Sequence, residues 1–391
     1  MKVPATTVAF SAAAAAMPAM SERTTINDTT SAQILMASSG QIQVAEYDGQ
    51  SFATTLNAPV SGAPTWVEFV EPNLLYAVDE NGSELRLFHL DLDSRKHHRH
   101  RRAPKLSEPV ATATGSSGVV HLAFNPDRTR MVGAGYGAGT IDIWNIEGEQ
   151  LSLIKTITSD GQTGPVSPNQ DSAHPHQSVL DPTGRYFLVN DLGTDSVLVI
   201  DSADDAWEVV HTLATPAACG PRHGVFSVDG DSTYYFALCE LSNQILRYTV
   251  SFAGDGGVSS ELLGTTDSIK GGNVQGAAAG EIALGPGGSS LYVSNRLLND
   301  RDEDNLTRFQ IQQGGGLAVQ DEVPSGGKLP RMFSIDGEGA TLFVGNQNGP
   351  DAVAAFALAD DGSLAAEASA TMPLSDFGGE GFGPAYIKRI R

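Results

Sequence analysis

One short pattern occurs six times along this chain, and it limits the fold more than any other feature. A turn centred on Pro or Gly is followed by an apolar run, a short polar gap and a second apolar run. The turn residues recur about every 50 residues and are Pro72, Pro126, Pro182, Gly230, Pro286 and Gly337. A period of this length, built of short β-type runs, predicts a β-propeller whose blades are four-stranded antiparallel sheets.

The two ends of the chain supply what a closed ring still needs. Residues 34–47 read as the outer strands of a blade that has no inner strand, and residues 384–390 read as an inner strand with nothing after it. Joining them closes the ring and leaves no open strand edge. The sequence therefore predicts an all-β, seven-bladed propeller in one domain over residues 34–391, with the last blade closed by N-terminal and C-terminal strands.

The first 20 residues have a different composition, with one Lys, an Ala-rich apolar stretch and then small residues. This order is typical of a secretory signal peptide, and a disordered leader is the alternative. The stretch is too short to span a membrane. Sequons at Asn27, Asn81 and Asn305 are compatible with secretion. We expect a secreted protein, with a cytoplasmic location as the alternative.

The chain has only two cysteines, Cys219 and Cys239. One precedes the first strand of its repeat and the other ends the second strand, so antiparallel pairing brings them close together. A disulfide between them and a pair of free buried thiols both fit this placement.

The formal net charge of −22 excludes some classes of partner. Such a surface repels phosphate backbones and anionic membranes, so we expect neither nucleic acid nor a membrane as a partner. The sequence has no P-loop, no Rossmann glycine fingerprint and no His-Glu-x-x-His zinc motif. We therefore expect no cofactor and no metal.

The blade arrangement predicts which distant residues meet. The start of a first strand and the end of a second strand lie at the same end of an antiparallel blade, so these positions gather at one mouth of the central channel. They are occupied by Thr65, His121, His176, Arg222, His223, Glu281 and Arg331 on first strands, and by Glu80, Tyr136, Asp191, Glu240, Arg296 and Gln347 on second strands. Arginines in a concave mouth suit an anionic ligand. Pairing of these arginines with acidic neighbours, which would only lock the blades, is the structural alternative.

Four segments at these positions resemble one known family. They are HPHQSVLDPTGRYFLVNDLGTDSV (174–197), GPRHGVFSVDGDSTYYFALCELSN (220–243), LYVSNR (291–296) and LPRMFSIDGEGATLFVGNQN (329–348). They resemble the seven-bladed lactonase propellers, which include 6-phosphogluconolactonase and carboxymuconate cyclase. The resemblance implies that His176, Arg222, Glu240 and Arg296 are the catalytic residues, with His174 as the alternative to His176.

The leading functional prediction is a cofactor-free cycloisomerase or lactonase that acts on a small polycarboxylate, most like carboxymuconate cyclase. Arg222 and Arg296 would hold carboxylates, and His176 or Glu240 would protonate the carbon that becomes anionic during ring closure. Further substrate contacts are expected from His174, His223, Arg331, Tyr136 and Gln347. The alternatives are hydrolysis of a sugar lactone such as 6-phosphogluconolactone, and a secreted binding propeller without catalytic activity.

Overall fold

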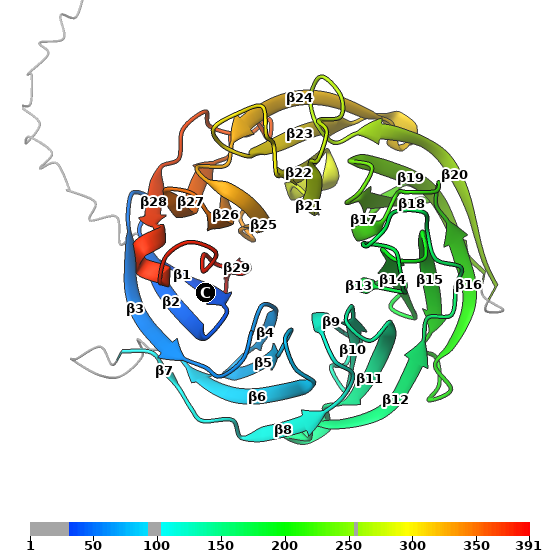
Figure 1. Cartoon of the computed structure of the whole chain (residues 1–391), viewed down its shortest axis with the longest axis horizontal. Helices are drawn as coiled ribbons and strands as arrows, with labels where there is room; N and C mark the ends of the chain where they lie inside the picture. Colours follow the sequence, from blue (N-terminus) through cyan, green and yellow to red (C-terminus); the bar gives the residue numbers. More distant parts are fainter. Residues whose placement is uncertain (1–30, 93–102, 254–256) are drawn as a thin grey trace, which may run out of the picture. The chain divides into compact units, whose positions relative to one another are not determined.

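Seven antiparallel sheets are arranged around a central axis, with the first strand of each sheet nearest the centre (Figure 1). The computed structural model describes residues 31–92, 103–253 and 257–391, and Ser31–Arg391 form one compact unit. The predicted leader at residues 1–20 and the sequon at Asn27 lie outside the described residues. The seven-bladed propeller predicted from the repeats is confirmed.

The blades follow one another in chain order from residue 67 onwards. Blade 1 contains β4 (Val67–Val70), β5 (Leu74–Val78), β6 (Glu84–Asp91), β7 (Lys105–Leu106) and β8 (Ala111–Thr114). Blade 2 contains β9 (Val119–Phe124), β10 (Arg130–Gly135), β11 (Thr140–Asn145) and β12 (Ser152–Thr158). Blade 3 contains β13 (Pro175–Leu180), β14 (Tyr186–Asp191), β15 (Ser196–Asp201) and β16 (Glu208–Ala214).

The second half of the ring repeats the same order. Blade 4 contains β17 (Pro221–Asp229), β18 (Ser232–Cys239), β19 (Gln244–Phe252) and β20 (Val258–Asp267). Blade 5 contains β21 (Ala278–Leu284), β22 (Ser290–Arg296), β23 (Asn305–Ile311) and β24 (Leu317–Pro324). Blade 6 contains β25 (Lys328–Ile335), β26 (Thr341–Asn348), β27 (Asp351–Ala357) and β28 (Ala370–Pro373).

Among the described residues, the remaining elements are the closing blade and four short 3₁₀ turns. Blade 7 contains β29 (Tyr386–Arg389), β1 (Ala32–Ser38), β2 (Gln41–Tyr47) and β3 (Phe52–Pro59). The 3₁₀ turns are η1 (Glu147–Glu149), η2 (Pro286–Gly288), η3 (Gln313–Gly315) and η4 (Leu374–Phe377). Within the described ranges, no helix has the length and apolar character needed to cross a membrane.

The repeated turn works because the residue before it fixes the backbone. Asn125, Asp181 and Asp336 stand directly before the Pro or Gly of three repeats, and their side-chain Oδ1 atoms accept hydrogen bonds from backbone N–H groups four or five residues later. Asn and Asp favour such turns because their short side chains imitate a backbone acceptor. The turn therefore joins first and second strands in a fixed register.

Closure of the ring pairs the two ends of the described chain. In blade 7, β29 lies antiparallel to β1, and Ala37 pairs with Tyr386 while Ile34 pairs with Arg389. This is the arrangement predicted from the incomplete segments at residues 34–47 and 384–390.

Apolar clusters fill the spaces between neighbouring blades. For example, Val132 and Ile143 of blade 2 pack with Phe187 and Trp207 of blade 3, and similar clusters join the other blades. Each second and third strand carries apolar residues on both faces, because each blade is covered on both sides. The channel is therefore bordered by a stiff wall, and the ends of its strands hold side chains in fixed positions.

Candidate functional site

Strand pairing brings the predicted residues to one mouth of the channel. Pro175 at the start of β13 pairs with Asp191 at the end of β14, and Pro221 of β17 pairs with Cys239 of β18. In blade 5, Ala278 at the start of β21 pairs with Arg296 at the end of β22. The starts of first strands and the ends of second strands thus meet as expected.

Glu240 joins two arginines from neighbouring blades. Its Oε2 lies 2.9 Å from Nε of Arg222 and 3.0 Å from Nη2 of Arg296. The Arg222 guanidinium also donates from Nη1 to the carbonyl of Gly280 at 2.7 Å, and Arg296 donates to the carbonyl of Ala279 at 2.8 Å. We call Arg222, Glu240 and Arg296 the arginine clamp.

The charges of the arginine clamp determine its protonation state. Burial raises the pKa of Glu240, but the charges of Arg296 and Arg222 outweigh this effect and hold the pKa below its usual value. Burial, together with the charge of Arg296, lowers the pKa of Arg222 to about 9. At neutral pH the clamp is therefore one carboxylate between two guanidinium groups, with a net positive charge.

His176 is a neutral imidazole beside the arginine clamp. Only 7% of the residue is exposed, and Nδ1 has no hydrogen-bond partner among the described residues. Burial, and then the charge of Arg222, hold the pKa of His176 well below 6.5. His176, Arg222, His223 and Arg331 line one small cavity of about 10 Å³, the space of one water molecule.

His223 packs against His176 and contacts the buried carboxyl group of Glu281. Its ring centroid is 5.1 Å from that of His176, and its Nδ1 lies 2.8 Å from Oε1 of Glu281. Burial raises the pKa of Glu281 to about 8, and burial lowers the pKa of His223. A neutral Glu281 carboxyl thus shares a hydrogen bond with a neutral His223, and the tautomer of the ring determines which of the two donates. His223 thus packs against His176 and contacts Glu281, and its predicted contact with substrate stays a prediction.

His174 and Tyr136 form a stacked pair at the edge of the mouth. Their ring centroids are 4.3 Å apart, and Nδ1 of His174 lies 2.7 Å from the backbone oxygen of Tyr136. The backbone N–H of His174 donates to Asp191, which also accepts from the backbone of Gly193. His174 thus orients Tyr136, whose ring lies edge-on to His176 with centroids 5.5 Å apart.

Arg331 and Gln347 come from blade 6. Nη2 of Arg331 donates to Oε2 of Glu80 in blade 1 at 2.8 Å, so this ion pair reaches past the closing blade. Gln347 lies on β26 near the same mouth, and no side-chain hydrogen bond joins it to the arginine clamp within the described ranges. The structure brings Arg331 to the cavity of His176 but gives Gln347 no such contact.

A disulfide fixes the backbone under the arginine clamp. Cys219 and Cys239 are bonded, with their Cα atoms 4.8 Å apart, so the alternative of two free thiols is excluded. Glu240 directly follows Cys239, and its backbone N–H donates to the carbonyl of Gly220 at 2.8 Å. Arg222 is two residues beyond Gly220. The covalent bond therefore ties together the two strands that carry Arg222 and Glu240.

Sequence reasoning did not assign roles to three residues of this mouth. Glu281 and Glu80 were expected there by register, but their pairing with His223 and Arg331 was not predicted. Trp66 was not expected; its ring centroid lies 4.0 Å from that of His121. No cluster of three or more His, Cys, Asp or Glu side chains suited to a metal ion occurs in the described residues.

The arrangement combines cationic donors with a neutral base. Two guanidinium groups can stabilise an oxyanion, and an unprotonated imidazole can accept a proton from water. The residues thus suit attack of water on a carbonyl group.

Comparison with known proteins agrees with the fold and the motifs. The chain matches the family model "Lactonase, 7-bladed beta-propeller" over residues 25–373. A relative from Arthroderma benhamiae, named "Probable 6-phosphogluconolactonase", is 29% identical over 334 residues, which cover 83% of this chain and 81% of that protein.

Two solved structures share the architecture. A periplasmic gluconolactonase of Pseudomonas aeruginosa is 23% identical with a TM-score of 0.74, over 91% of this chain and 98% of that one. A Lactobacillus plantarum protein is 25% identical with a TM-score of 0.73, over 93% of this chain and 100% of that one. With the family model matched over most of its length, this chain belongs to the lactonase family of seven-bladed β-propellers.

Proposed function

We propose that this protein hydrolyses the lactone of a sugar acid. The observation that carries this proposal is the arginine clamp next to the neutral, unpartnered imidazole of His176. The Arthroderma benhamiae relative carries the name of a 6-phosphogluconolactonase, which supports the same substrate class.

In the proposed reaction His176 accepts a proton from water while the water oxygen adds to the lactone carbonyl carbon. Arg222 and Arg296 stabilise the oxyanion that forms there. The ring C–O bond then breaks, and the proton held by His176 passes to the departing ring oxygen, which gives the open hydroxy acid. Arg331, whose side chain is partly exposed at the mouth, binds a phosphate or hydroxyl group of the substrate outside the small cavity.

The protonation states favour hydrolysis over the cyclisation that we expected first from the sequence. Cyclisation needs a residue that donates a proton to carbon. The charges of Arg296 and Arg222 keep Glu240 ionised, and burial keeps His176 neutral. Both groups suit a proton acceptor, and neither suits a donor at neutral pH. The Arthroderma benhamiae relative carries the name of a 6-phosphogluconolactonase, which also supports hydrolysis.

The test is a side-by-side assay of the purified full chain on glucono-δ-lactone, 6-phosphogluconolactone and 3-carboxy-cis,cis-muconate. Proton release above the spontaneous rate on either sugar lactone is the expected result. Turnover of the muconate alone would restore the cyclase interpretation. No turnover of any of the three would favour a propeller that only binds its ligand.

Two variants distinguish a loss of the arginine clamp from a general loss of stability of the ring. Arg296→Ala should lower kcat/KM on the sugar lactone by about a hundredfold, because it removes one oxyanion donor. Arg185→Ala is the matched control, since Arg185, directly before β14, is paired with Asp201 at the end of β15 and has no contact with the arginine clamp. Equal activity of the two variants would contradict the proposed role of the clamp.

We also propose that the protein is exported to an oxidising compartment. The support is the Cys219–Cys239 disulfide, because such bonds persist mainly outside the reducing cytosol. Asn81 is exposed and could accept a glycan, whereas Asn305 is buried on β23 and has no room for one. Sequencing the N-terminus of the mature protein tests the proposal, since an uncleaved Met1 in secreted or cytosolic fractions would contradict processing of the leader.

A further inference from the structure

The channel holds a second, larger cavity at its opposite end. Its volume is about 620 Å³, which lies in the range of sites for small molecules. The walls come mainly from the second halves of the first strands β9, β13, β17 and β21. The arginine clamp lies at the starts and ends of strands at the other mouth, so the two cavities occupy opposite ends of one channel.

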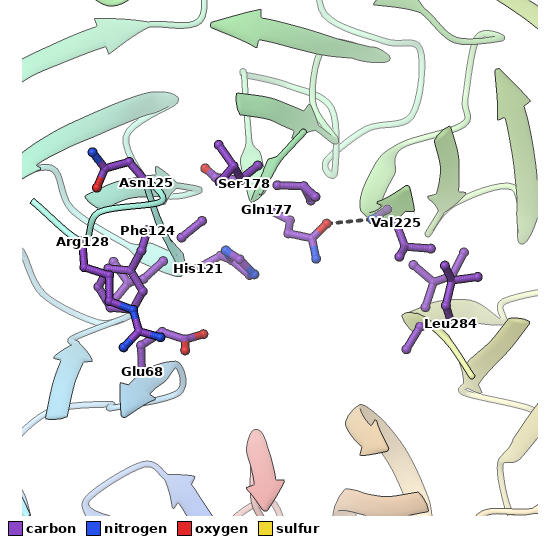
Figure 2. A pocket seen from close by; sticks show the side chains of 16 residues that line it. Glu68, His121, Phe124, Asn125, Arg128, Gln177, Ser178, Val225 and Leu284 are labelled. Carbon is purple, nitrogen blue, oxygen red and sulfur yellow. Dashed lines mark hydrogen bonds between the residues drawn. The ribbon is translucent and has the colours of Figure 1, made fainter. Parts of the chain in front are cut away.

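The floor of this cavity carries polar groups. Figure 2 shows the side chains of Glu68, His121 and Gln177 extending toward the middle of the space. His121 is 6% exposed, and its Nδ1 has no hydrogen-bond partner among the described residues. Oε1 of Gln177 accepts the backbone N–H of Gly224 at 2.7 Å, while its amide nitrogen donates to no described group. The floor thus offers hydrogen-bonding capacity that the protein leaves unused.

The rim of the same cavity is apolar. Phe124, Leu180, Val225 and Leu284 surround it, each from a different blade. Each also packs by part of its surface against one of the apolar clusters between neighbouring blades. A molecule that filled this space would meet apolar atoms near the solvent and polar atoms at the bottom.

Charged residues on the floor and at the rim of this cavity disfavour an ionic ligand. Inside, the Glu68 carboxylate repels anions, and its Oε2 forms an ion pair with Nζ of Lys388 on the closing strand at 3.5 Å. At the rim, the exposed Arg128 forms no ion pair within the described ranges and repels cations. Burial, together with the nearby His223, lowers the pKa of His121 well below 6.5, so this ring adds no positive charge at neutral pH.

We propose that this cavity binds a small neutral molecule with a hydroxyl group at one end and an apolar ring or chain at the other. The hydroxyl group would donate to Glu68 and accept from His121 or Gln177, while the apolar part would contact Phe124, Leu180, Val225 and Leu284. This site is separate from the proposed lactonase site. The His121 ring faces the large cavity, and its centroid lies 5.7 Å from that of His223, which lines the small cavity at the other mouth.

Binding can be measured on the full chain with 4-fluorobenzyl alcohol followed by fluorine NMR. We expect saturable line broadening with the alcohol and at least tenfold weaker binding of 4-fluorobenzoate, which has the same ring and a negative charge. Equal or tighter binding of the benzoate would overturn the neutral-ligand proposal. Absence of saturable broadening with the alcohol would overturn it as well.

Two variants assign the binding to the floor of the cavity. His121→Phe keeps the ring that packs on Trp66 but removes the unpartnered nitrogen, and it should weaken binding of the alcohol about tenfold. Glu68→Gln keeps an acceptor for Nε1 of Trp66 and provides a second test if the first variant folds poorly. Arg296→Ala should leave binding of the alcohol unchanged. Loss of binding in Arg296→Ala alone would place the alcohol at the other mouth and contradict the proposal.

Location can be checked directly with crystals soaked in 4-bromobenzyl alcohol. The anomalous signal of bromine should lie at the apolar rim, between Phe124 and Leu284. A bromine signal found only beside Arg222, or only on the outer strands, would refute the site.

Discussion

Glu240 is the residue on which the geometry of the proposed active site depends. Its single oxygen Oε2 contacts guanidinium groups from blades 4 and 5, and both guanidinium groups also donate to backbone carbonyls of β21. A carboxylate in this position compensates part of the charge of Arg222, which is only 2% exposed. The same contact keeps both arginines near the cavity lined by His176, without a metal ion in the proposed reaction.

The protonation state of His176 leads to a pH prediction. Burial and the neighbouring Arg222 hold its pKa well below 6.5, so the imidazole is already neutral at mildly acidic pH. A general base works only when it is unprotonated, so kcat/KM should be level between about pH 6.5 and 8 and fall only at lower pH. Steady-state rates on the sugar lactone across this range check the prediction. A decline centred on an ordinary imidazole pKa would contradict it.

A matching variant tests the residue itself. His176→Phe should reduce kcat by about a hundredfold or more, since the base is lost. The midpoint of urea unfolding should stay close to that of the wild type, because no hydrogen bond of Nδ1 is broken. A large loss of stability with full specific activity of the remaining folded protein would instead assign His176 a structural role.

Glu281 gives a prediction about stability. Its carboxyl releases a proton near pH 4.3 in the unfolded chain, and burial raises its pKa to about 8 in the folded protein. Between these values the folded state binds more protons, so Glu281 lowers the free energy of unfolding as pH rises, by about 1.4 kcal/mol per pH unit. Glu281→Gln does not titrate, so its stability relative to the wild type should increase from about pH 5 to about pH 7.5.

Urea unfolding of both proteins at the two pH values measures this difference. Ser227→Ala is the control, because Ser227 lies on β17, the first strand of the neighbouring blade 4, and its side chain does not titrate in this range. A constant difference between Glu281→Gln and the wild type would mean that Glu281 is already ionised at the lower pH.

At the residue scale, sequence reasoning predicted where side chains lie better than it predicted their hydrogen-bond partners. The register of the repeats placed His174 and His223 at the correct mouth, and their contact with substrate stays a prediction. It did not predict that their Nδ1 atoms lie against the backbone oxygen of Tyr136 and against Glu281. These contacts join different blades, and a periodic pattern within each blade contains no information about side-chain rotamers across the gap.

At the scale of strands, the predicted turns identified the inner part of each blade. First, second and third strands are apolar because neighbouring blades cover them, so their apolar runs are easy to recognise in the sequence. The outer strand of blade 1 is divided into β7 and β8, which pair with different ends of β6. Outer strands face solvent and alternate only weakly, so the sequence indicated their presence without their limits.

The Cys219–Cys239 bond connects strands β17 and β18 and gives a prediction at this scale. Replacing both cysteines with Ala should lower the free energy of unfolding by about 3 kcal/mol, as expected for closing a loop of this size. Activity on the sugar lactone should fall too, because Glu240 follows Cys239 directly. Urea unfolding and kcat/KM of the double variant measure both effects. An unchanged kcat/KM would show that the arginine clamp keeps its geometry without the covalent bond.

At the scale of the whole ring, closure depends on four residues of β29. Their apolar members, Tyr386 and Ile387, are fully buried, and Ile387 packs with Phe343 of blade 6 and with β1 residues of blade 7. Closure joins the two ends of the sequence, and it removes the two strand edges that an open ring would expose. Loss of contacts in β29 should therefore weaken the ring as a unit rather than only the last few residues.

Two neighbouring substitutions on β29 test this prediction. Ile387→Ala should lower the free energy of unfolding by about 3 kcal/mol, because it leaves a cavity between blades 6 and 7. Lys388→Ala, at the next position on the exposed side, should change it by less than about 1 kcal/mol, since only a partly exposed ion pair with Glu68 is lost. If urea unfolding followed by tryptophan fluorescence gave equal losses for both, β29 would fray independently. Trp66 contacts Tyr386 of β29, whereas Trp144 and Trp207 lie in blades 2 and 3. A large shift for Ile387→Ala alone that persists in a Trp66→Phe background would therefore report cooperative loss of the whole ring.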